Sequence, residues 1–349
     1  TRAEITPWTF DNEYHFGDFS GNAMEMLRRG YDVHFHYANY GIRSLFIRLP
    51  SGFSCDSSVA SYIDEEGLSV IKDKRGPGVI FAIEPFYEPG DLEELWDDGG
   101  LYDRLCGVRA ELLSGDLRPL YLASLSVRLD CEHDPDETLE APAPAGLDQL
   151  TSAQSALAEY LGLDKFVVEA AAMNSDPLPQ RSDRKRQYAQ WLESQPEKTK
   201  NKWLLELLAE ERSTVRAKIL TAFHEGSDTL LWPTTPGERT MRQLIDAAEA
   251  LSRGDKARVT RENADRLAEL HQNMSKDPKP FLKKVDQLIK QQTMAAYGQA
   301  AKLLADLRDV LADGTQSTLA DDKAQKLREK YPTRRHMISV LKKQGFLNK

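Results

Sequence analysis

The chain has 349 residues, of which 40% are hydrophobic and 29% are charged, proportions that are typical of a globular protein. No apolar run approaches the roughly 20 residues that a membrane-spanning helix needs. The chain also lacks the basic start and apolar stretch of a secretion signal. We therefore expect a cytoplasmic protein with no membrane partner, built from two or three domains.

The net charge of −9 hides a division along the chain. Residues 1–150 contain 12 Lys+Arg and 28 Asp+Glu, whereas the remainder carries a net charge of +7. This change of sign, next to an acidic and proline-rich segment, predicts a domain boundary. The expected regions are an acidic α+β domain at 1–130, a linker or crossing loop at 131–146, a helical domain at 147–226, and a region of helical hairpins and tail at 227–349.

The first 130 residues mix short strand and helix patterns. Residues 11–21 predict an irregular loop, and residues 22–30 predict a short helix that ends on a glycine. From residue 31 apolar and polar side chains alternate, which predicts a strand with one apolar and one polar side. Further strands are expected at 44–49, 68–72 and 79–84, and helices at 57–62, 101–113 and 117–129.

Strand patterns disappear after residue 146. Apolar residues recur at helical spacing, and residues 238–274 predict a long helix or a helical hairpin. Three or four more helices are expected beyond it. The fold class is therefore an α+β N-terminal domain with a small, mainly antiparallel sheet, followed by a mainly α-helical C-terminal half. The earlier helices are expected at 150–161, 164–173, 183–193, 199–210 and 213–223.

Asp32, His34 and His36 share the polar side of the strand that begins near residue 31. Successive side chains on one side lie about 6.5 to 7 Å apart. Two imidazoles and a carboxylate can bind one metal ion and leave a position for water, and His15 could add a nitrogen. Such a site would activate water for hydrolysis. The alternative is a polar cluster that is structural or faces a partner.

A basic group lies near two tryptophans in the helical half. This combination can follow phosphates and stack on bases, or it can face a protein partner. Acidic residues are interleaved through the same helices, which is typical of solvated helix surfaces. The group comprises Arg181, Arg184, Lys185, Arg186, Lys198, Lys200, Lys202, Trp191 and Trp203.

Other motifs for chemistry are missing from the sequence. There is no Gly-x-Ser-x-Gly elbow, no phosphate loop and no His-Glu-x-x-His helix. The three cysteines, Cys55, Cys106 and Cys131, are far apart and odd in number, which indicates reduced thiols rather than a disulfide framework. The sequence therefore assigns no catalytic residue and no cofactor.

Three phrases of the sequence are specific enough for comparison with a family: NEYHFGDFSGN at 12–22, YDVHFHYANYGIRSLFIRLP at 31–50 and GDLRPLYLASL at 115–125. Together they resemble an uncharacterised bacterial protein family. The helical tail, with WPTTPGERTMRQLIDAAE at 232–249 and KLREKYPTRRHMISVLKKQGF at 326–346, is similar to tails in that family and in some bacterial SWIM-type zinc-finger proteins. The Cys-x-Cys and Cys-x-His pairs of that finger are missing here, so the resemblance implies no zinc-finger role and no mechanism.

These observations favour a non-enzymatic interaction or scaffold protein that binds another protein. Two alternatives stay open. One is a metal-assisted hydrolase or nuclease that uses Asp32, His34 and His36. The other is a nucleic-acid-associated protein that uses the basic helical half.

Overall fold

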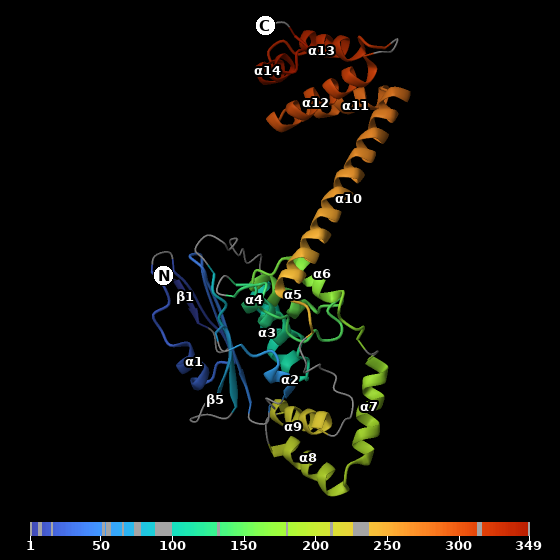
Figure 1. Cartoon of the computed structure of the whole chain (residues 1–349). Helices are drawn as coiled ribbons and strands as arrows, with labels where there is room; N and C mark the ends of the chain where they lie inside the picture. Colours follow the sequence, from blue (N-terminus) through green and yellow to red (C-terminus); the bar gives the residue numbers. More distant parts are fainter. Residues whose placement is uncertain are drawn as a thin grey trace. The chain divides into compact units, whose positions relative to one another are not determined.

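The chain forms two compact units, Thr1–Ser252 and Arg253–Lys349, in the computed structural model (Figure 1). The expected boundaries at 130, 146 and 226 all fall inside the first unit. The structure describes residues 2–5, 9–14, 17–50, 53, 57–64, 66–72, 78–87, 100–130, 133–178, 181–209, 212–225, 237–312 and 316–347.

Two small antiparallel sheets lie in the first unit. One pairs β1 with β2, and the other has four strands in the order β3-β4-β6-β5. The expected small antiparallel sheet is confirmed. The strands are β1 (Arg2–Ile5), β2 (Phe10–Glu13), β3 (Val33–Ala38), β4 (Ile42–Leu49), β5 (Leu68–Lys72) and β6 (Val79–Ile83).

The prediction of an irregular loop from residue 11 is wrong for residues 11–13. These residues belong to β2, which pairs along its length with β1. Their own sequence does not alternate in hydrophobicity, so no local pattern indicated a strand. The backbone of β1 supplies the hydrogen-bond partners, and pairing of this kind depends on a second segment.

The two sides of the four-stranded sheet are covered by different parts of the chain (Figure 1). Phe35 of β3 stacks on Tyr102 with ring centroids 4.9 Å apart, which places the apolar side of β3 against the helices. The short helix α1 (Ala23–Arg29) contacts β3, begins at the side chain of Asn22 and ends at Gly30. The neighbouring helices are α2 (Ser57–Ala60), α3 (Leu101–Leu113), α4 (Arg118–Arg128) and α5 (Ser152–Tyr160).

One hydrophobic core runs through this sheet and its helices. It includes Leu45 and Ile47 of β4, Ala170 of α6 (Lys165–Ala172) and Leu244 at the start of α10 (Met241–Lys276). Residues on both sides of the segment 131–146 therefore pack into the same core. The burial of apolar surface from distant parts of the chain joins them into one unit.

Three more helices of the first unit meet at an aromatic cluster. The ring of Trp191 lies 5.5 Å from that of Trp203 and 5.4 Å from that of Phe223, while Tyr188 lies 4.8 Å from Phe223. Phe223 is buried. These rings join α7 (Arg181–Ser194), α8 (Glu197–Ala209) and α9 (Arg212–Glu225).

The second unit is helical in the part of it that the structure describes. α10 is continuous through Gly254, so the expected helical pattern at 238–274 forms a long helix and not a hairpin. Beyond it a core that includes Val285, Leu304 and Leu341 holds four helices together. The expected mainly helical C-terminal half is confirmed. The four helices are α11 (Lys279–Lys290), α12 (Met294–Leu311), α13 (Leu319–Lys330) and α14 (Arg335–Lys343).

Among the residues that the structure describes, no helix is both long enough and apolar enough to cross a membrane.

Candidate functional site

Asp32 contacts two arginines. Its Oδ1 atom lies 2.8 Å from Nη2 of Arg48 and 3.1 Å from Nη2 of Arg109. Arg109 also donates a hydrogen bond from Nε to the carbonyl oxygen of Arg48 at 2.7 Å. The carboxylate therefore links the start of β3 to β4 and to α3 through charge-assisted hydrogen bonds.

His36 pairs with Asp18, which lies in the loop before α1. The Nε2 atom of His36 is 2.7 Å from Oδ1 of Asp18, and the hydroxyl of Tyr40 donates to Oδ2. Burial acts to raise the pKa of the Asp18 carboxyl, but the hydrogen bonds from Tyr40, from the Phe19 amide and from His36 together lower it. Asp18 is thus held as a carboxylate at neutral pH.

His34 lies between two aromatic rings. The imidazole centroid is 5.1 Å from that of Phe19 and 5.9 Å from that of Phe46. Its Nε2 atom is buried and has no hydrogen-bond partner within the described parts of the chain. Burial, and then the nearby His36, lower the pKa of His34, which favours its neutral form.

The predicted metal set is therefore divided among different surroundings. Asp32 contacts arginines, His36 contacts Asp18, and His34 contacts phenylalanines. The fourth member, His15, lies outside the described residues. Binding of a metal by this set stays a prediction.

Another histidine, His133, lies against carboxylates at the opposite edge of the sheet, next to the start of β5. The Nε2 atom of His133 is 3.6 Å from Oδ2 of Asp64 and 3.8 Å from Oε2 of Glu66. These three residues are a group whose ligand atoms all lie within 4.8 Å of one another. Sequence reasoning missed this group because His133 lies more than 60 positions from Asp64 and Glu66 and shares no motif with them.

Two features of the fold bring these residues together. Asp64 and Glu66 belong to the turn that leads into β5, and His133 follows α4. Gly67, in that turn, lies against Val127 of α4 so closely that a Cβ atom there would be 2.7 Å from the valine methyl groups. The missing side chain therefore lets the turn approach the end of α4.

The other ring nitrogen of His133 is fixed by Asp130. Its Nδ1 atom lies 2.8 Å from Oδ1 of Asp130, whose Oδ2 accepts a hydrogen bond from the Phe86 amide at 3.2 Å. Burial acts to lower the pKa of His133, but the hydrogen bond to Asp130 and the charges of Asp130, Asp64 and Glu66 together raise it. A proton on Nδ1 leaves Nε2 free to face the other two carboxylates.

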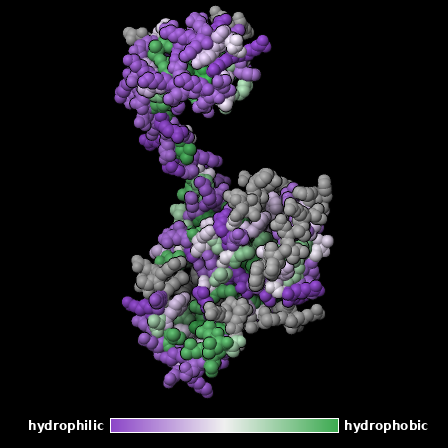
Figure 2. Space-filling model, turned by 180° about the vertical axis from the view of Figure 1, so that it is seen from behind, coloured by the Kyte–Doolittle hydropathy of each residue, from purple (hydrophilic) through white to green (hydrophobic). Residues whose placement is uncertain are grey.

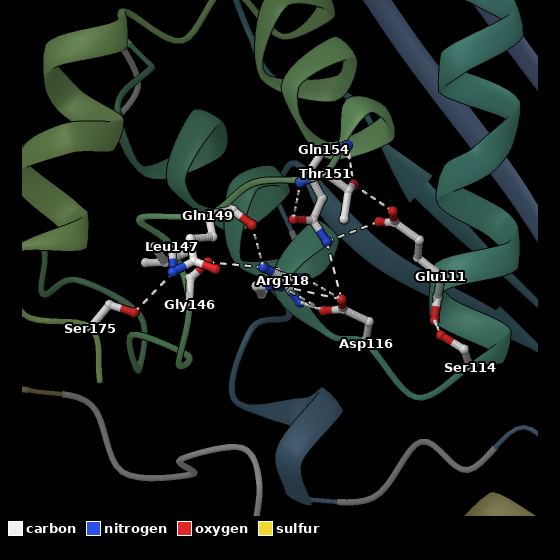
Figure 3. Close-up of polar contacts among 10 residues, drawn as sticks. All are labelled: Glu111, Ser114, Asp116, Arg118, Gly146, Leu147, Gln149, Thr151, Gln154 and Ser175. Carbon is white, nitrogen blue, oxygen red and sulfur yellow. Dashed lines mark hydrogen bonds and ion pairs between the residues drawn. The ribbon is translucent and has the colours of Figure 1, made fainter. Parts of the chain in front are cut away.

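A larger group of buried charges surrounds Arg118 (Figure 3). Its guanidinium donates to Asp116 Oδ2 at 2.7 Å and to the carbonyl oxygens of Gly146 and Gln149 at 2.9 and 3.0 Å. Gln154 in turn donates to Asp116 and to Glu111. Arg118, Asp116 and Gln154 are buried and satisfy one another, so we interpret this group as an anchor for residues 146–154.

The two tryptophans of the predicted basic group stack on each other, as described above. Lys185, Arg186, Lys198 and Lys202 are exposed, and Lys202 pairs with Glu206 at 3.8 Å. The Nζ atom of Lys200 lies 3.5 Å from the Glu193 carbonyl oxygen. The side chains of Arg181 and Arg184 lie outside what the structure describes.

Comparison with known proteins found no matching family model, no matching curated protein and no matching solved structure. The resemblance to an uncharacterised bacterial family therefore stays a prediction.

Proposed function

We propose that this chain is a non-enzymatic interaction protein that binds another protein through the outward side of α8. The observation behind this proposal is a group of exposed leucines on one helix. Leu204, Leu205 and Leu208 are 59%, 67% and 87% exposed, and no residue of α8 is buried. Contiguous apolar surface of this kind is typical of protein-binding sites.

The opposite side of α8 is already in contact with its neighbours. Trp203 stacks on Trp191 of α7, and Glu206 forms an ion pair with Lys218 of α9 at 3.5 Å. These two contacts show that the side of α8 with Trp203 and Glu206 faces α7 and α9. Leu204 and Leu208, one helical turn apart, then form a stripe directed away from α7 and α9. Figure 2 shows apolar side chains gathered where α8 and α9 lie.

The surroundings of this leucine surface (Leu204, Leu205, Leu207 and Leu208) support a particular kind of partner. Lys198 and Lys202 are exposed near the start of the same helix. An amphipathic helix with an apolar stripe and acidic flanks would bury the leucines and pair with the lysines. Burial of a leucine side chain contributes about 1.5 to 3 kcal/mol. Three leucines would therefore contribute about 4.5 to 9 kcal/mol, which is comparable to the cost of association, so the ion pairs with the lysines must add to the affinity.

A photo-crosslinking amino acid placed at position 205 of the full chain tests this proposal in cells. The expected result is a discrete crosslinked product whose second component is a protein, and the product should disappear in the Leu204→Gln/Leu208→Gln variant. Because both leucines are exposed, this variant should keep the melting temperature of the wild type within about 2 °C.

A crosslinker at position 267 is a matched control, because Leu267 is also an exposed leucine on a helix. It should not give the same product. Crosslinking at 205 that survives the two glutamine substitutions would contradict the proposal, and so would an absence of any product at that position. Turnover of a defined substrate by the purified chain would contradict the non-enzymatic part.

The other two functions stay predictions with tests of their own. For the nucleic-acid-associated reading, affinity for DNA or RNA should fall steeply with salt and fall further in Lys198→Gln/Lys202→Gln. For the metal-assisted hydrolase reading, hydrolysis should depend on metal and be lost in His34→Gln and His36→Gln. Neither outcome is expected from an interaction protein.

A further inference from the structure

We propose that Asp64, Glu66 and His133 bind one divalent transition-metal ion such as Zn²⁺ or Mn²⁺, with Asp130 as the residue that positions the histidine. The site differs from the Asp32, His34 and His36 set and does not depend on the proposed protein partner. One imidazole and two carboxylates are ligands that both ions accept.

The distances fit a shared ion better than direct hydrogen bonds. The separations of 3.6 Å and 3.8 Å between His133 Nε2 and the two carboxylate oxygens are too long for a good hydrogen bond. Ligand atoms about 2.0 to 2.2 Å from one ion in a tetrahedral arrangement lie about 3.4 Å from one another. The two histidine distances exceed this value by a few tenths of an ångström, and the ligand atoms of all three residues lie within 4.8 Å of one another. Movement of the exposed Glu66 side chain would therefore close the site around an ion.

Other hydrogen bonds already direct the ligand atoms toward the site. Oδ1 of Asp64 accepts from the Glu66 amide at 3.3 Å, which leaves Oδ2 to face the histidine. Asp130 accepts from Nδ1 of His133 and has a side chain that is almost fully buried. A carboxylate in this position fixes the tautomer and orientation of a metal-binding imidazole and increases its basicity.

The site combines a fixed part and an accessible part. Asp64 and His133 are largely covered, whereas the Glu66 side chain is 75% exposed. An ion can therefore enter from the Glu66 side, and the three protein ligands leave a further position for water.

Arg128 is a nearby cation that opposes binding. Burial lowers the pKa of its guanidinium, and the charge of Asp64 acts against that shift. Its side chain is held elsewhere, by a hydrogen bond from Nε to Ser124 and another from Nη1 to the Leu139 carbonyl oxygen. The three carboxylates of Asp64, Glu66 and Asp130 carry more negative charge than Arg128 carries positive charge, so their combined charge favours a cation.

Isothermal titration of the chelator-treated full chain with Zn²⁺ and with Mn²⁺, at pH 7.5, tests the site. The expected result is one bound ion per chain for at least one metal. His133→Gln and Asp64→Asn should each reduce affinity at least 100-fold. Asp130→Asn should reduce it about 10- to 100-fold, as loss of a positioning partner does. Co²⁺ can replace Zn²⁺ as a spectroscopic probe of the same site. A change in its absorption bands between the wild type and a variant would be a second sign that the ligands have changed.

Glu66→Gln keeps the test decisive if a buried variant fails to fold, because Glu66 is exposed and its replacement should leave stability unchanged. It should still reduce affinity at least 10-fold. His336→Gln, at an exposed histidine of α14, is the matched control and should bind like the wild type. An absence of stoichiometric binding, or equal affinity in Glu66→Gln and the wild type, would overturn the proposal.

The leucine variant Leu204→Gln/Leu208→Gln should bind the metal normally. Failure of the metal site and failure of the protein-binding proposal are therefore separate results.

Discussion

Arg239 forms a two-point ion pair with Glu140, a residue 99 positions earlier in the chain. Nε and Nη2 of the arginine lie 2.6 and 2.7 Å from the two carboxylate oxygens of Glu140. Tyr121 donates a further hydrogen bond to the same carboxylate at 2.5 Å. The group joins α4, the crossing segment and the residues just before α10.

Removal of Arg239 should destabilise the first unit strongly. Among the described residues, Arg239→Met leaves the buried Glu140 carboxylate with the tyrosine hydroxyl as its one partner. Loss of one partner of a buried pair costs about 3 to 5 kcal/mol. Urea unfolding followed by circular dichroism measures the change. The double variant Glu140→Leu/Arg239→Met should lose less than the sum of the two single variants. A loss below about 1 kcal/mol in Arg239→Met would contradict this view.

Loss of the hydroxyl should destabilise the protein at Tyr121 but not at Tyr62. The Tyr121 hydroxyl is bonded to Glu140, whereas the Tyr62 hydroxyl is buried and has no hydrogen-bond partner in the part of the chain that is described. Tyr121→Phe should lower the free energy of unfolding by about 1 to 2 kcal/mol. Tyr62→Phe should leave it unchanged or raise it, because an unsatisfied buried group disappears. Equal losses in the two variants would show that the Tyr62 hydroxyl has a partner.

His34 and His133 should give stability opposite dependences on pH. The pKa of His34 is lowered in the folded protein, so between that pKa and the unfolded value of about 6.5 the unfolded chain binds more protons. Stability should therefore fall as pH falls through 6.5. The pKa of His133 is raised, so its contribution is complete below about 6.5 and is lost as pH rises through the folded pKa.

Unfolding free energies measured from pH 5 to pH 8.5, in the presence of chelator, separate the two effects. His34→Gln should reduce the slope on the acidic side, and His133→Gln should reduce the slope on the alkaline side. The same slope in the wild type and both variants would mean that neither imidazole has a shifted pKa.

Two glycines should differ in their tolerance of a methyl group. Gly78 has a φ of 115°, and a Cβ atom there would lie 1.8 Å from the Leu49 carbonyl oxygen. Gly78→Ala should cost more than about 1 kcal/mol because the backbone or β4 must shift. Gly254 lies in α10 with nothing near its Cβ position, so Gly254→Ala should increase stability by about 1 kcal/mol. Thermal unfolding of the two variants compares them directly, and a stabilised Gly78→Ala protein would contradict the close contact.

The local sequence pattern was sufficient to predict secondary structure where the residues that determine it are close together in the sequence. The alternation from residue 31 to 38 predicted β3 and its apolar side, and Phe35 does pack on Tyr102. The glycine at position 30 indicated the end of α1. β2 escaped prediction because its strand conformation depends on pairing with β1.

The sequence by itself therefore determined the antiparallel sheet, the change to helices and the two sides of β3, because side-chain periodicity follows backbone geometry. It also predicted that Asp32, His34 and His36 share one side of the strand. Only the tertiary structure decided which atoms these side chains contact, and it paired Asp32 with Arg109 of α3. It also decided that Asp64 and Glu66 lie beside His133. The turn at Gly67 packs against Val127 of α4, and this contact brings the two carboxylates to the histidine. The spacing of residues within the turn, or after α4, does not indicate the contact.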